Sequence, residues 1–163
     1  MAFDNADFIA IRAAVLDLAS GTGRFPGGVI DHEPMSAPTD AIGCVAAWVS
    51  MTMAPIRTSG LSSVDLRLEA IVRIMLNAHS EPYGLIDAEV FGAASALMEA
   101  LCGHFSLGKV SGVRQIDIFG SEGGGEGGAL RMESGYIQID QTKYRCVDVY
   151  IPILINNSYT QSE

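Results

Sequence analysis

Hydrophobic residues alternate with other residues from Tyr144 to Asn156 with a strict period of two. Alternation over this length predicts a strand that presses one face against a core. Pro152 lies inside the segment and donates no backbone hydrogen bond, so we expect a sheet edge or a bulge there. The positions of one parity are all β-branched, a residue type that fits a pleated surface: Val147, Val149, Ile151, Ile153 and Ile155.

The segment just before this strand alternates too, from Gly135 to Ile139. A short turn over Asp140 to Thr142 separates the two, which is the pattern of a β-hairpin. Two earlier segments, residues 42–53 and 64–76, also read as strands. A helix over 66–76 is the alternative for the second, but its regular alternation favours a strand.

In the first of these two strands, one side carries Val45, Ala47, Val49, Met51 and Met53 and is the more apolar of the two. Trp48 falls on the other side. There it would either anchor an interface, as aromatic residues often do, or lie partly buried under the first helix.

Apolar residues at three- and four-residue spacing predict two helices. The first begins at a cap on Asp4 or Asn5 and ends near Ser20; the second begins at a cap on Asp87 and ends near Cys102. A strand over 113–119 follows. The order of helix, two strands, helix and three strands predicts a single α+β domain with a mostly antiparallel sheet and two main helices on one face.

Two long loops and a C-terminal tail at 157–163 complete this plan. Residues 24–40 are rich in proline and glycine, and residues 29–32 within them have the composition of a short edge strand. Residues 120–128 are mostly glycine. Loops of this length in a compact domain usually bind something or order against a partner.

Charge and composition exclude several classes of protein. The formal net charge is −9, with 19 acidic and 10 basic side chains, which disfavours a surface that grips nucleic acid. No apolar run spans a bilayer, and Asp4 and Asp7 do not suit a signal peptide, so we expect no membrane partner. The three cysteines show no metal-ligand spacing, which predicts reduced and mostly buried thiols.

Candidate chemistry is sparse. The glycine-rich loop lacks the lysine and following helix of a phosphate site, and it holds Glu122 and Glu126 instead. Asp31, His32 and Glu33 are consecutive, and strand neighbours point to opposite faces, so they do not converge on one metal ion. No serine stands in a nucleophile elbow. We therefore predict no catalytic residues, no metal and no cofactor, and we treat these five residues as candidate interface or lumen positions.

The order of elements along the whole chain, and above all the last third, resembles the tail terminator proteins of long-tailed bacteriophages and related tail-like particles. In that family an aspartate-bearing strand leads through a variable loop to a hairpin, whose last strand ends in an apolar run before Asn or Asp. The matching residues here are Asp117, Tyr136, Asp140, Tyr144, Arg145 and the run from Ile151 to Asn157.

The resemblance implies a structural virion protein that is made in the host cytoplasm and has no enzymatic activity. It would form a homohexameric ring that caps the head-proximal end of the tail tube and stops tube polymerisation. Its partners would be further copies of itself, the tail tube protein and the head–tail connector, while DNA passes through the lumen without specific binding. The alternatives are a tail-tube or neck subunit, and a small-ligand-binding α+β module with its pocket between helices and sheet.

Overall fold

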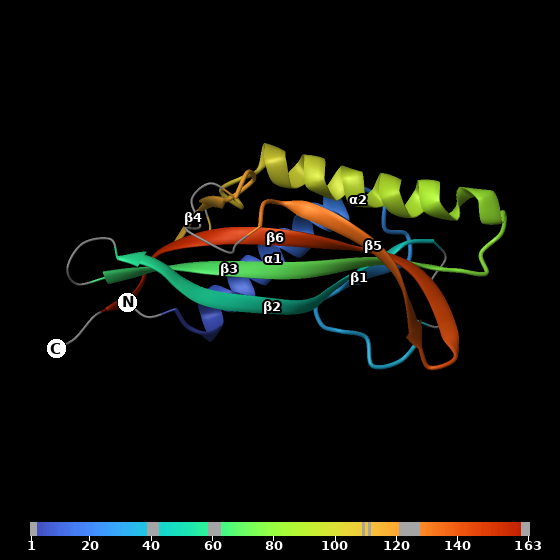
Figure 1. Cartoon of the computed structure of the whole chain (residues 1–163), viewed down its shortest axis with the longest axis horizontal. Helices are drawn as coiled ribbons and strands as arrows, with labels where there is room; N and C mark the ends of the chain where they lie inside the picture. Colours follow the sequence, from blue (N-terminus) through green and yellow to red (C-terminus); the bar gives the residue numbers. More distant parts are fainter. Residues whose placement is uncertain are drawn as a thin grey trace.

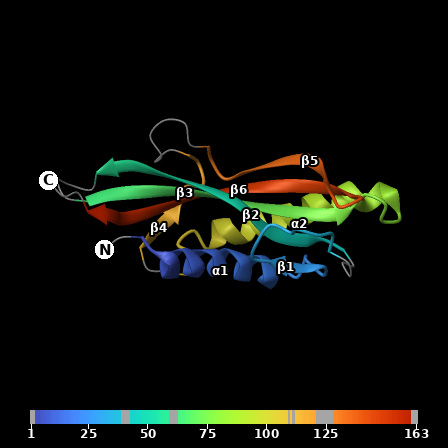
Figure 2. The ribbon, with the colours of Figure 1, turned by 90° about the horizontal axis from the view of Figure 1, so that it is seen from below.

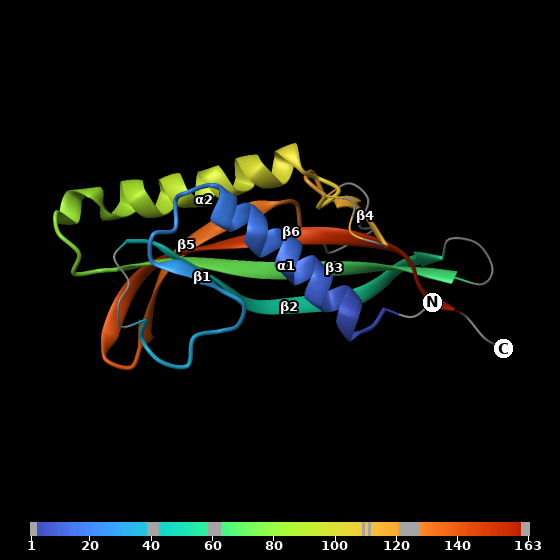
Figure 3. The ribbon, with the colours of Figure 1, turned by 180° about the vertical axis from the view of Figure 1, so that it is seen from behind.

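A computed structural model describes residues 3–38, 43–58, 63–108, 110, 112–120 and 128–160. The strands form one curled sheet in the order β1-β2-β3-β6-β4, and β5 also pairs with β6. Both long helices lie on the same face of this sheet, which Figures 2 and 3 show from below and from behind. The chain is therefore an α+β protein with a mostly antiparallel sheet, as predicted; among the described strand pairs only β1 with β2 is parallel.

The molecule is elongated along the strands, and both termini lie at the same end (Figure 1). The helices are α1 (Asn5–Gly21) and α2 (Ile86–Gly103), with the short 3-10 helix η1 (Tyr83–Leu85) before α2. The strands are β1 (Gly28–Ile30), β2 (Val45–Thr58), β3 (Ser63–Asn77), β4 (Val113–Ile116), β5 (Arg131–Ile139) and β6 (Thr142–Thr160).

Strand β6 is the centre of the fold. Its five predicted core side chains are all buried, with exposures of at most 4%, and they join the hydrophobic cluster beneath the helices. Residues 157–160 belong to β6 rather than to a tail, because the strand continues to pair with β3 as far as Thr160. Only 161–163 of the expected tail lie outside the described residues.

Pro152 is not at an edge of the sheet, because β3 pairs with β6 on one side along its whole length. On the other side β6 changes partner: β5 pairs up to Tyr150, and β4 pairs from Ile153 onward. The Pro152 carbonyl accepts from the Asp117 N–H at 2.8 Å on that side. In an antiparallel strand the N–H and the carbonyl of one residue point to the same side, so the N–H that proline lacks would face the side on which β6 changes partner, and the pairing with β3 is unaffected.

Both faces of the first long strand pack against other residues. Cys44, Ala46 and Trp48 of the β2 segment face the helices, whereas Val45 and Ala47 join a second small cluster on the other face. A bulge between Trp48 and Ser50 then shifts the phase, so that Met51 packs on the main core. Both sides of this segment are apolar because both are covered, and alternation cannot choose between two covered faces.

The helix starts differ in how well the sequence predicted them. Asp4 caps α1 and forms a capping box with Asp7, as expected from its place before the helix. The prediction that Asp87 caps α2 is wrong: the helix begins at Ile86 with no side-chain cap. Asp87 accepts instead from Arg145 Nε of β6 at 2.8 Å, which joins the first turn of α2 to the sheet.

Candidate functional site

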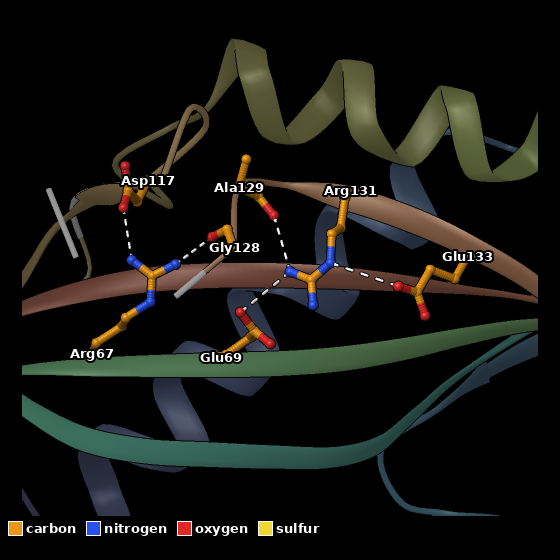
Figure 4. Close-up of polar contacts among 7 residues, drawn as sticks. All are labelled: Arg67, Glu69, Asp117, Gly128, Ala129, Arg131 and Glu133. Carbon is orange, nitrogen blue, oxygen red and sulfur yellow. Dashed lines mark hydrogen bonds and ion pairs between the residues drawn. The ribbon is translucent and has the colours of Figure 1, made fainter. Parts of the chain in front are cut away.

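The face of the sheet opposite the helices carries a ladder of paired charges, which we call the charged ladder. It consists of Arg67, Glu69 and Arg73 on β3, Asp148 on β6, Arg131 and Glu133 on β5, and Asp117 just after β4. Figure 4 shows its central part, with side chains from three segments converging above the ribbon of the sheet. The ladder combines three guanidinium groups with four carboxylates.

The innermost pair is Arg67 with Asp117, in which Arg67 Nη1 donates to Asp117 Oδ2 at 2.7 Å. Both side chains are buried, at 7% and 2% exposure. Arg67 Nη2 also donates to the carbonyl of Gly128, while its Nε has no partner among the described residues. Arg67 therefore holds both ends of the 117–128 segment against the sheet (Figure 4).

The outer pairs of the charged ladder are partly exposed. Arg73 makes a two-pronged contact with Asp148, with Nε and Nη2 at 2.7 and 2.9 Å from the carboxylate oxygens. Hydrogen bonding to Asp148 is the main reason that the pKa of Arg73 is raised. Arg131 lies over the Tyr150 ring at 4.2 Å and is 3.5 Å from Glu69. Every guanidinium of the ladder is thus next to a carboxylate, and its three arginines nearly balance its four acidic side chains.

Strand β2 leaves a long edge of the sheet open. Strand β1 pairs only with Val45 to Ala47, so β2 has no outer neighbour from Trp48 to Thr58 among the described residues. No charged residue occurs from Cys44 to Ile56. Exposed edges usually carry charges that oppose pairing with another chain. Here two bulges, Pro55 and the single charge of Arg57 oppose pairing, and the stretch from Trp48 to Ala54 can still accept a further strand.

A cleft of about 530 Å³ opens on the charged-ladder face, between the loop 31–38 and the end of the β5–β6 hairpin. Met75 of β3, Val49 of β2, and Ile137 and Ile139 of β5 form its apolar side, and they belong to the second hydrophobic cluster. The Ala37 N–H donates to Asp140 Oδ2 at 2.9 Å, which ties the loop to the turn of the hairpin.

Three predicted positions lie in the loop after β1, and only one borders this cleft. Asp31 and His32 contact each other, with Oδ1 and Nδ1 2.8 Å apart, and this hydrogen bond is the main reason that the pKa of Asp31 is lowered. Glu33 lines the cleft. No group of three metal-ligating side chains occurs within the described ranges, this trio included.

The remaining predicted positions are not on a described surface. Trp48 is 4% exposed and makes an edge-to-face contact with Phe8 of α1, with ring centroids 5.9 Å apart. Trp48 is therefore not an exposed interface anchor. It lies under the first helix, which was the second of the two alternatives that the sequence left open. Glu122 and Glu126 lie outside the described residues.

Sequence reasoning missed the charged ladder and the open edge. Arg67, Glu69 and Arg73 alternate along a strand, which is a visible signal that this face of β3 is not wholly buried. Their partners lie 50 or more positions away in the chain, at Asp117, Arg131 and Asp148. Those pairings depend on strand order and register, which the alternation does not contain.

Comparisons with known proteins do not assign the chain to a family: no model of a known family matches it, and a search of curated proteins finds no match. Within the part of the chain that the structure describes, no helix is long and apolar enough to cross a membrane.

The cysteines allow a direct check of the packing. Cys44 and Cys146 are buried and Cys102 is exposed. Burial raises the pKa of Cys44 to about 11 and also raises that of Cys146, so both thiols stay protonated at pH 8 and react slowly. We expect a thiol reagent at pH 8 to modify Cys102 rapidly and the other two only in denaturant. Rapid modification of all three in the folded protein would contradict the packing of β2 and β6.

Proposed function

We propose that this protein is a structural assembly protein of the tail terminator kind, which forms a ring at the head-proximal end of a tail tube, ends tube growth and joins the tail to the head connector. The sequence resemblance supports the tail role. The geometry supports the self-association that such a ring needs, and the observation that carries it is the open edge of β2, which has no charged residue from Trp48 to Ile56.

Strand directions favour a ring contact in which two different edges meet. Three antiparallel pairings lead from β2 through β3 and β6 to β5, so β2 and β5 run in opposite directions. A second copy placed edge to edge in the same orientation would bring its β5 alongside β2 as an antiparallel strand. Such a contact uses two different patches on each subunit. It produces a closed ring when the rotation from one subunit to the next divides a full turn into a whole number of steps.

The near-neutral charged ladder also fits this role. A ring that lets DNA pass gains from a surface without clustered cations, because binding to phosphate requires uncompensated Lys and Arg. Each arginine of the ladder is already next to a carboxylate. If this face borders the lumen, DNA would pass it without binding specifically.

The first test is the mass of the purified protein in solution, by native mass spectrometry across a range of concentrations. We expect a species of six subunits, each of 17.3 kDa, that does not grow further, and single rings in negative stain. Open-ended fibres would instead identify a tube subunit. A monomer at every concentration, also in the presence of tail tubes, would overturn the proposal.

A charge on the β2 edge should prevent assembly while leaving the subunit folded. Thr52 is exposed and lies opposite Glu69 of β3, so Thr52→Lys places an ammonium beside a carboxylate within the monomer. At the edge the same ammonium would have to be desolvated to accept another strand. We expect the concentration of half-assembly to rise at least about tenfold, equivalent to about 1.4 kcal/mol.

The matched control is Ser95→Lys, which adds the same charge on the exposed side of α2. Sedimentation of both variants, with circular dichroism to confirm folding, separates an edge effect from a net-charge effect. Equal assembly of Thr52→Lys and the parent protein would exclude the β2 edge as the contact, whereas equal weakening by both variants would point to charge alone.

A second candidate, a small-ligand-binding module, is supported by the cleft beside the hairpin. This cleft lies on the face opposite the helices, not between helices and sheet. A monomeric protein whose melting temperature rises with a small organic ligand would favour this function over the ring.

A further inference from the structure

We propose that the cleft between the loop 31–38 and the β5–β6 hairpin binds an extended peptide segment of a partner protein, in which an arginine or lysine stands between aliphatic residues. The inference requires no ring and holds for a monomer as well. It rests on the charge of the rim, the apolar character of the floor and the rigidity of the walls.

The rim of the cleft is acidic. Glu33 stands on the loop side and Asp140 on the hairpin side, and neither carboxylate forms an ion pair within the described part of the chain. The cation at the cleft, Arg73, is already engaged by both oxygens of Asp148. Glu33 also contributes to the raised pKa of Arg73, but three carboxylates, Glu33, Asp140 and Asp148, stand against this one cation. The opening therefore has an excess of negative charge and favours a cationic occupant.

The floor is apolar. Val49, Ile137 and Ile139 are half-buried beside the fully buried Met75. Covering this apolar surface with a ligand would remove it from water, which is favourable. Met35, at the rim, is 88% exposed, which extends the apolar area beyond the cleft. Arginine and lysine match this arrangement, because their aliphatic stems lie along apolar surface while their charged ends reach polar groups.

The walls are held in place before any ligand arrives. Asp140 has a positive φ of 53° in the turn, and its side chain accepts the Ala37 N–H. This hydrogen bond links the loop to the hairpin before binding, which lowers the ordering cost of binding. A volume of about 530 Å³ lies within the range of ordinary ligand sites.

The test is a titration of the isotope-labelled protein, followed by amide NMR shifts, with three capped pentapeptides: SLRLS, SLELS and SSRSS. We expect SLRLS to produce saturable shifts at residues 33, 35–37 and 137–140, with a dissociation constant at least about tenfold lower than that of either other peptide. Shifts scattered over the surface, no shifts with SLRLS, or equal binding of SLELS would overturn the proposal.

The variant that isolates the rim is Glu33→Gln with Asp140→Asn. Asparagine tolerates the positive φ and retains an acceptor for the Ala37 N–H, so the hydrogen bond between the hairpin turn and the loop should remain. We expect SLRLS to bind about three- to tenfold more weakly, the loss of two exposed charge contacts. Glu99→Gln on α2, an exposed acid remote from the cleft, is the control and should leave binding unchanged. Unchanged affinity in the double variant would refute the role of the rim.

Discussion

Replacing Ile153 by aspartate is expected to abolish the folded state. Ile153 is fully buried in β6, between Leu68 of β3 and Ile116 of β4. A carboxylate there would lose its hydration and find no cation, at a penalty of several kcal/mol. Domains of this size have a total stability of roughly 5–15 kcal/mol, so the loss removes much or all of it.

Urea unfolding followed by circular dichroism measures this effect, with soluble expression as the first readout. Ile153→Val is the control for the same site, because it removes one methylene and should cost only about 0.5–1.5 kcal/mol. A cooperative transition for Ile153→Asp within 1 kcal/mol of the parent protein, on the order of a surface substitution, would show that β6 is not the centre of the core.

Replacing Arg67 by methionine should have the second largest effect. The substitution keeps an aliphatic side chain but leaves Asp117 buried without its cation and the Gly128 carbonyl without its donor. Removal of one partner from a buried ion pair typically costs about 3–5 kcal/mol. We expect a loss of this order in the free energy of unfolding.

A double-mutant cycle separates the pair from the packing. Arg67→Met with Asp117→Leu removes both charges and should recover most of the loss, because the desolvated carboxylate is then absent. Arg131→Met is the matched control: Arg131 is 37% exposed, and its removal should cost at most about 1 kcal/mol. Equal losses for Arg67→Met and Arg131→Met would mean that burial does not set the strength of these contacts.

The sequence predicted the fold best where one face of a strand is apolar and the other is not. In β3 the face from Leu66 to Leu76 is apolar and the opposite face carries charges, so the alternation located the strand and the side that faces the helices. In β2 both faces are covered, so the alternation did not show which side faces the helices. A bulge at Val49 shifted the phase further, and a bulge leaves no signature in hydrophobicity alone.

The candidate site was less accessible to sequence reasoning, for a physical reason. The charged ladder is built from residues that become neighbours only through strand register, as Arg73 and Asp148 do. The open edge of β2 depends on β1 pairing with only three residues of a much longer strand. The acidic loop was selected from its sequence, but its significance comes from Asp140, which lies 107 positions after Glu33.

Pro152 has a consequence for how this chain can vary in length. It lies where β6 changes partner from β5 to β4, and the chain between these two strands is held at Asp117 and at Leu130. Both ends of that segment are fastened, at Arg67 and by the Ile118–Leu130 backbone contact. Insertions and deletions between Gly120 and Gly128 would therefore leave the pairings of β4 and β5 with β6 unchanged, so we expect length variation to be tolerated best there.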